Sequence, residues 1–423
     1  MTEEFLSFLW KYQLFNTTEL RVDGEKVEII QPGELNRNSG PDFFNSKVKI
    51  GKTVWVGNVE IHLKASDWYH HNHDKNAAFD NVILHITAEN DQPVYSSKGR
   101  KVATVILDFD TAHLRNYKTL IANKKWIPCA DDLPKVDTII ITSLLSKMGI
   151  ERLEYRTNQI TDSLDKTIND WEESFYWQIA RSYGFHVNSQ PFESLARSIP
   201  YHIVKKHSNN QTQLEAIFFG QAGFLLDDYN NDEYYNKLRK EYEFLRGKYN
   251  LQPVETHIWK FMRLRPGNFP TIRIAQFIGL LSRNTSIFSS IIEAKDLETL
   301  YTLLSADVSE YWKCHYTFGN LSRSVTKTIG KESAKIIIIN TIAPFYFIYG
   351  KKLGLTQYED MALQILEEID AEDNSIIKDW RQHGIKPKSA FESQALLHLK
   401  NEYCDKKRCL DCGIGVKIIS KGS

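Results

Sequence analysis

Several residue types are scarce in this chain, and each scarcity narrows the class of protein. The 423 residues include 5 cysteines, 12 prolines and 21 glycines. Five cysteines are an odd and sparse set that cannot form a disulfide framework, so we expect a reducing, cytoplasmic environment. Few prolines and glycines, and no low-complexity tract, indicate an ordinary globular protein.

An excess of charge and a long uninterrupted apolar run are also missing. Lys plus Arg and Asp plus Glu both number 53, so any nucleic-acid-binding surface must be local. The first four residues lack the basic segment and apolar run of a secretory signal. The longest apolar run, 336–350, is interrupted by Asn340, Thr341 and Pro344, so we expect a buried helix and no membrane association.

What the chain does contain predicts an α+β or α/β domain followed by helices. A short apolar helix and several strand-like segments occupy the first third, and from about residue 138 the pattern favours helices separated by loops. We predict a domain with a mixed sheet over 1–125 and a linker near 124–135. A helical domain over 136–330 and a helical region over 331–423 follow.

The segment 53–64 places polar groups on one face of a strand. Alternate side chains of a strand share a face, so Asn58, Glu60, His62 and Lys64 line up together. Burying such a row is costly unless partners satisfy it, and a metal ion would do so. Asp42 precedes the neighbouring strand, so its carboxylate and that of Glu60 are candidates to hold one hard cation.

These residues resemble a known nuclease pattern. Asp42, followed by Glu60-Ile61-His62, is similar over roughly the first 110 residues to the PD-(D/E)XK nuclease superfamily, with His62 in the place of the lysine. The resemblance implies a restriction-endonuclease-like mixed sheet with flanking helices. It also implies Mg²⁺ or Mn²⁺ held by Asp42 and Glu60, with Glu34 as a further carboxylate. His62 or Lys64 would handle the attacking water and charge while DNA or RNA is hydrolysed.

Over its whole length the chain resembles an uncharacterised bacterial family of unknown function, which implies no activity. Two other functions remain open: a non-catalytic module that binds nucleic acid or protein through a degenerate nuclease fold, and a zinc-dependent hydrolase of a non-nucleic substrate. A purely structural alternative is also open, in which Asp42 caps a turn and the polar face of 53–64 is solvated.

Histidines cluster in the same region. Five of the 13 histidines fall within 24 residues, namely His62, His70, His71, His73 and His85. Imidazole suits Zn²⁺ and other transition metals, which makes His73 and His85 candidate ligands. The spacing matches no strong zinc motif. The alternative is that His70, His71 and His73 decorate an exposed loop while His85 is a hydrogen-bonded core residue.

Three cysteines near the C-terminus have the spacing of a metal knuckle. Cys404, Cys409 and Cys412 supply three ligands, and a tetrahedral zinc site needs four. His398, six residues before the first of them, is the predicted fourth ligand, since Cys129 or Cys314 would have to arrive from far away in sequence. We expect structural zinc, with an iron–sulfur cluster as the less favoured cofactor, and the alternative is three ordinary thiols.

The segment 260–273 combines cations with aromatic residues. Arg263, Arg265 and Arg273 are candidate phosphate contacts, because guanidinium groups bind phosphate in a bidentate manner. The alternative is a structural loop in which these arginines pair with carboxylates of neighbouring helices.

Overall fold

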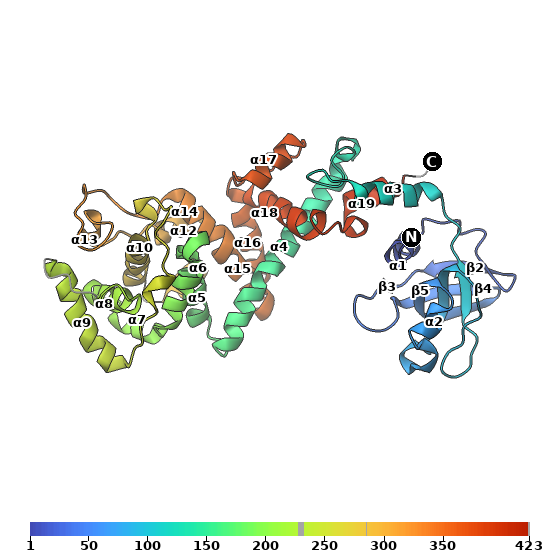
Figure 1. The fold of residues 1–423 in the computed structure, drawn as a ribbon, viewed down its shortest axis with the longest axis horizontal. Coiled ribbons are helices and arrows are strands. Elements are labelled where there is room, and N and C mark those ends of the chain that lie inside the picture. The colour runs from blue at the N-terminus through green and yellow to red at the C-terminus, as the bar shows by residue number, and fades with distance from the viewer. Residues whose placement is uncertain (227–231, 285, 422–423) are drawn as a thin grey trace. The chain divides into compact units, whose positions relative to one another are not determined.

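The computed structural model describes residues 1–226, 232–284 and 286–421, which form two compact units (Figure 1). The first unit comprises residues 1–146, 382–385 and 397–423, and the second comprises 147–381 and 386–396. The region 331–423 is therefore divided between the two units, because the chain returns to the first unit after crossing the second.

The first unit contains the predicted mixed sheet. Its seven strands are β1 (Arg21–Val22), β2 (Glu25–Gln31), β3 (Glu34–Leu35), β4 (Phe43–Ile50), β5 (Thr53–Lys64), β6 (Val82–Glu89) and β7 (Ala103–Ile106). The strands follow the order β1-β2-β4-β5-β6-β7, with β3 paired to β4. The pairings β4–β5 and β2–β4 are antiparallel, whereas β5–β6 and β6–β7 are parallel, so the prediction of a mixed sheet is confirmed.

The parallel register between β5 and β6 fixes which residues of β6 lie opposite the polar residues of β5. Glu60 pairs with His85, and Lys64 pairs with Glu89 at the far end. The register shifts next to Gly57, where a Cβ would lie 2.5 Å from the carbonyl oxygen of Asn81. The missing side chain at Gly57 therefore lets the start of β6 approach the backbone of β5.

Helices and short turns complete the first unit. They are α1 (Glu3–Tyr12), α2 (Asp67–His70), η1 (His73–Lys75), η2 (Ala77–Phe79), α3 (Thr111–Ala122), η3 (Leu133–Lys135), η7 (Leu399–Cys404), η8 (Cys409–Asp411) and α19 (Gly413–Ile419). Helix α1 begins at the cap residue Thr2 and buries an apolar face of Phe5, Leu6, Phe8, Leu9 and Trp10. The returning C-terminal segment is tied to α3, where the Nδ1 atom of His113 lies 2.8 Å from the carbonyl oxygen of Ile419.

The second unit is helical, as predicted. Helix α4 (Thr138–Lys166) begins in the first unit and continues into the second. The others are α5 (Trp171–Tyr183), α6 (Phe185–Arg197), α7 (Tyr201–His207), α8 (Gln211–Gln221), α9 (Glu233–Tyr249), η4 (Thr256–Ile258), η5 (Pro266–Asn268), α10 (Pro270–Arg283), α11 (Ile287–Ile292), α12 (Leu297–Leu304), α13 (Glu310–Lys313), α14 (Lys331–Ile337), η6 (Ile338–Ile342), α15 (Ala343–Leu353), α16 (Thr356–Glu368), α17 (Ser375–Gln382) and α18 (Ala390–His398).

One stretch of the second unit is longer than the sequence suggested. Residues Lys331–Leu353 form a continuous helical segment that is long and apolar enough to cross a membrane by length and composition alone, and 72% of its most apolar window is buried inside the protein. The π-helical turn η6 precedes Pro344. A wider turn at this point accommodates the proline, which has no N–H for the helical ladder.

Candidate functional site

Asp42 and Glu60 meet beside the junction of β4 and β5. The backbone N–H of Asp42 donates to Oε2 of Glu60 at 3.1 Å, and the backbone N–H of Ile61 donates to Oδ2 of Asp42 at 2.9 Å. Glu60 is only 6% exposed. Burial and the neighbouring Glu60 carboxylate raise the pKa of Asp42 to about 7. Each carboxylate thus accepts a hydrogen bond from a backbone N–H at or next to the other residue, which holds the two acidic side chains next to each other.

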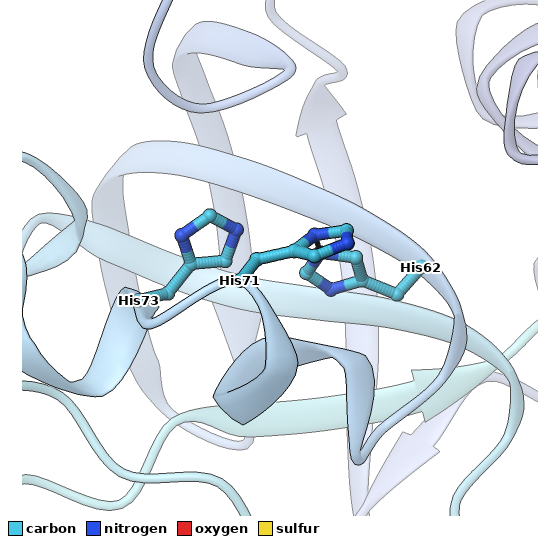
Figure 2. A group of neighbouring side chains, drawn as sticks. All are labelled: His62, His71 and His73. Atoms are coloured by element: carbon cyan, nitrogen blue, oxygen red, sulfur yellow. Dashed lines mark hydrogen bonds between the residues drawn. The ribbon is translucent and has the colours of Figure 1, made fainter.

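Three histidine rings gather next to this pair (Figure 2). Nδ1 of His62 lies 2.9 Å from Nε2 of His85, and Nε2 of His62 lies 3.1 Å from Nδ1 of His71. One ligand atom from each of His62, His71 and His73 lies within 4.8 Å of the others. Strand β5 supplies His62, whereas His71 and His73 come from the turn after α2, so the sheet and the turn build the group together.

Glu60 joins the histidines through its second oxygen. Oε1 of Glu60 lies 3.5 Å from Nε2 of His62 and 3.2 Å from Nε2 of His73. Tetrahedral coordination with bonds of about 2.0–2.2 Å places neighbouring ligand atoms about 3.3–3.6 Å apart. The observed separations are close to this range: 3.1 Å between His62 and His71, 3.2 Å between Glu60 and His73, and 3.5 Å between Glu60 and His62. His62, His71 and His73 therefore form a group that could hold one metal ion, and Glu60 contacts two of its three members.

The protonation of the rings suits metal binding. Burial, reinforced by the neighbouring histidines, lowers the pKa of His62 to about 3, and burial likewise lowers that of His85 to about 3. Both rings are thus neutral at pH 7, and the approach of His62 to Glu60 is not an ion pair. Neutral imidazole is the form that ligates transition metals.

Buried polar atoms without hydrogen-bond partners also indicate a metal site. Among the described residues, the buried ring nitrogens of His73 and Nδ1 of His85 have no hydrogen-bond partner of normal geometry. Buried polar atoms without partners are costly, and a cation bound by His73 would remove part of that cost. A set of three imidazoles and one carboxylate suits Zn²⁺ or Mn²⁺ better than the all-oxygen shell that Mg²⁺ prefers.

A third carboxylate, missed by the sequence analysis, comes from α1. The half-buried Glu3 interacts electrostatically with His71 and Glu60, and a backbone hydrogen bond at Leu63 holds its carboxylate. Burial is the largest effect and raises the pKa of Glu3. Acidic residues in a first helical turn are common because they favour the helix dipole, so the sequence offered no signal that separates Glu3 from Glu4.

A groove of about 550 Å³ in the first unit opens onto Asp42 and Glu3. The cationic side chains along it are Lys11, Arg37, Lys406, Lys407 and Arg408. Arg37 and Arg408 are also paired with Asp411, at 2.5 and 3.1 Å. The carboxylates of Glu3, Glu4, Asp42 and Asp411 line the same groove, so its cations are in slight excess, which suits an anionic ligand.

Two predicted residues, Lys64 and Glu34, lie apart from the group, as does His70. Lys64 is exposed, and its Nζ atom lies 3.0 Å from a carboxylate oxygen of Glu89. Glu34 is exposed on β3, and Glu3 rather than Glu34 is the third acid that interacts with Asp42. His70 is exposed and lies 3.2 Å from Asp67. His85 contacts His62 and supports that ring rather than completing the group of three.

The C-terminal cysteines acquire a different fourth partner from the predicted His398. A small cavity is lined by Cys129, Cys404, Cys409 and Cys412, and His398 does not line it. Burial, with the neighbouring thiols, raises the pKa of Cys129 to about 12 and that of Cys409 to about 11. Cys129 lies in the loop after α3, a position that no local sequence pattern connects to residues 404–412.

The arginines of segment 260–273 belong to the second unit, and one of them is buried. Arg273 donates to Gln276 at 3.0 Å and to Asn268 at 2.7 Å, and its guanidinium lies over the ring of Phe185. Burial lowers the pKa of Arg273 to about 10. Arg273 is therefore a packing residue, and its predicted nucleic-acid contact is wrong. Arg263 and Arg265 are exposed.

Comparison with known proteins adds a family but no activity. No curated protein and no solved structure matches the chain. One family model, described as "Protein of unknown function (DUF2851)", matches residues 3–375. This match includes Glu3, Asp42, Glu60 and the histidines, and it spans most of the chain. The chain belongs to this family of proteins of unknown function (DUF2851).

Proposed function

We propose that the first unit is a metal-dependent hydrolase that cleaves phosphodiester bonds in DNA or RNA. The observation that carries the proposal is the group of His62, His71 and His73, whose ligand atoms lie within 4.8 Å of one another, with Glu60 3.5 Å from His62 and 3.2 Å from His73. A bound Zn²⁺ or Mn²⁺ would polarise the phosphoryl oxygen and lower the pKa of a bound water.

The protein's own groups then have separate tasks. Glu60 and the three histidines hold the ion, and His85 orients the ring of His62 through the 2.9 Å contact. Four carboxylates line the groove, and of these Asp42 and Glu3 interact with Glu60, so they are the ones assigned to the substrate and its attacking water. The water oxygen bonds to phosphorus, the bond from phosphorus to one ester oxygen breaks, and a carboxylate accepts the water proton.

The groove supports nucleic acid as the substrate. Lys406 and Lys407 lie along the same groove as Asp42, where Lys406 is paired with Glu402 and Lys407 donates to the carbonyl oxygen of Ile121. Their positive charge would attract the phosphates of a nucleic-acid backbone. A small neutral substrate would have no use for such a line of cations. This difference favours a nuclease over a zinc hydrolase of a non-nucleic substrate.

The test incubates the purified full chain with labelled single-stranded and duplex DNA and RNA, in the presence of Mn²⁺, Zn²⁺ or Mg²⁺. We expect cleavage with Mn²⁺ or Zn²⁺, and loss of about 100-fold or more in Glu60→Gln. Glu28→Gln is the matched control, because Glu28 is exposed on β2 and outside the site. Equal cleavage by wild type and Glu60→Gln would remove the site from the mechanism.

A binding module with a degenerate site gives a different result. It would bind the labelled DNA or RNA and the metal ion, but no cleavage product would form with Mn²⁺, Zn²⁺ or Mg²⁺. That outcome overturns the proposal of turnover. Metal binding together with neither cleavage nor retention of nucleic acid would overturn the assignment of substrate class.

A further inference from the structure

Four of the five cysteines meet in one small cavity of the first unit. Cys129 arrives from the loop after α3, and Cys404, Cys409 and Cys412 come from η7, η8 and the start of α19. Three of these side chains are buried, and none of the four is in a disulfide. The cavity holds only about 20 Å³ of open space, and its exposed lining is apolar.

The convergence is hard to explain by packing alone. A free cysteine often serves as a small buried hydrophobe, but four sulfur atoms around one cavity form a set of soft ligands. The backbone is also closely packed around the cavity, since the Cys409 carbonyl group packs directly against Gly415. Four thiolates are the ligand set of a structural zinc ion or of an iron–sulfur cluster.

The spacing of the sulfur atoms distinguishes the two metals. Zinc–sulfur bonds of about 2.3 Å in tetrahedral geometry would place the sulfur atoms about 3.8 Å apart. Among the described residues, the group whose ligand atoms all lie within 4.8 Å of one another is the histidine group, and the four sulfur atoms do not form such a group. They are therefore spread more widely than a single zinc ion requires.

We infer that Cys129, Cys404, Cys409 and Cys412 hold an iron–sulfur cluster that fixes the cationic loop 406–408 along the groove. Cys404 and Cys409 bracket this loop directly in the chain. Arg408 lines both the cysteine cavity and the groove. The loop is also anchored at Lys407, whose ammonium group donates to the carbonyl oxygen of Ile121.

The role of the cluster is to position residues, and no chemical step takes place on it. With the cluster in place, Lys406 and Lys407 remain along the groove that Asp42 also lines. Without it, Cys129 is no longer tied to the C-terminal segment and the loop loses one of its supports. The effect on substrate binding rests on the proposed nuclease function, whereas the cluster itself does not.

The first experiment measures iron, acid-labile sulfide and zinc in the full chain purified without oxygen. We expect iron and sulfide in equal amounts, with a broad visible absorption that dithionite bleaches. Cys129→Ser and Cys412→Ser should lose the iron, and Cys314→Ser should keep it, because Cys314 lies in the second unit. One zinc ion per chain without iron would overturn the cluster, and no metal of either kind would overturn the site. The iron, sulfide and zinc content of the wild-type chain distinguishes these outcomes even if a variant fails to fold.

The second experiment measures binding of labelled single-stranded and duplex DNA and RNA in the absence of divalent cations. We expect roughly tenfold weaker binding after loss of the cluster and after Lys406→Glu/Lys407→Glu, with the iron retained in the lysine variant. Unchanged binding after loss of the cluster would overturn the positioning role. Iron and sulfide found in a chain that cleaves no nucleic acid would support the cluster and overturn only the proposed function.

Discussion

The backbone of Gly415 packs directly against Cys409. A Cβ atom at position 415 would lie 2.1 Å from the carbonyl oxygen of Cys409, well inside any normal contact. Gly413, two residues earlier, is different, because a Cβ there would lie 3.9 Å from side chains of Ile140 and Leu144. The two glycines therefore form a matched pair for testing the C-terminal knuckle.

Gly415→Ala should disturb the cysteine site. We expect this change to lower the free energy of unfolding of the first unit by about 1–3 kcal/mol, because the backbone must shift to admit the methyl group. The iron content should fall with it. Gly413→Ala should leave both quantities near the wild-type values. Urea unfolding and metal analysis of the two variants measure the difference, and equal behaviour would contradict the packing described.

Replacing Glu3 should affect catalysis more than replacing Glu34. Glu3 interacts with Glu60 and His71, whereas Glu34 is exposed on β3. We expect Glu3→Gln to reduce cleavage by about tenfold or more, and Glu34→Gln to have no measurable effect. The reverse order of effects would restore Glu34 as the third acid and remove Glu3.

His73 and His70 provide a test of the metal ligands. His73 is 8% exposed, and its Nε2 atom lies 3.2 Å from Oε1 of Glu60, whereas His70 points toward solvent beside Asp67. Loss of one ligand should weaken Mn²⁺ binding by about tenfold or more in His73→Ala. His70→Ala should bind Mn²⁺ as the wild type does. A titration followed by electron paramagnetic resonance reports this site, because Mn²⁺ has little affinity for thiolates.

Glu215 should make the second unit less stable as the pH rises. Its side chain is fully buried on α8 and accepts a hydrogen bond from the hydroxyl of Tyr234, and burial raises its pKa to about 7 from 4.5. Between these two pH values the folded state keeps a proton that the unfolded state has lost. The free energy of unfolding therefore falls from pH 4.5 to about 7 and is constant above that range.

Glu215→Gln removes the titrating group. We expect it to stabilise the second unit at pH 8 by on the order of 2–3 kcal/mol and to flatten the dependence on pH. Thermal unfolding of both proteins between pH 5 and 8 provides the measurement. If stability of the Glu215→Gln variant changes with pH as steeply as that of the wild type, other groups cause the pH dependence.

Local sequence patterns were sufficient for the central hairpin. The alternation in 53–64 predicted a strand there, with a neighbouring strand after Asp42, and both are confirmed as Thr53–Lys64 and Phe43–Ile50. Asp42 and Glu60 could be paired from this hairpin, because adjacent strands and a short turn fix their separation. Contacts within one hairpin depend mainly on nearby residues, so a single sequence carries enough information to find them.

Longer-range contacts could not be found in this way. The side chain of Lys64 reaches Glu89 because the parallel register sets these two residues opposite each other, and that register involves a second strand beyond a loop. Cys129 and Cys412 line the same cavity, although the whole helical unit lies between them in the sequence. Glu3 depends on the packing of α1 against the sheet. Each of these positions is determined by tertiary structure, and no spacing in the sequence reports it.

The division of the first unit between the two ends of the chain has a consequence for biosynthesis. Residues 397–421 complete this unit, yet the ribosome makes them only after the 235 residues of 147–381. Domains generally fold in the order of their synthesis, so the helical unit can become compact while the groove still lacks its cationic loop. The first unit therefore gains the loop 406–408 only after residues 397–421 have been made, and any property that depends on this loop is absent until that stage of synthesis.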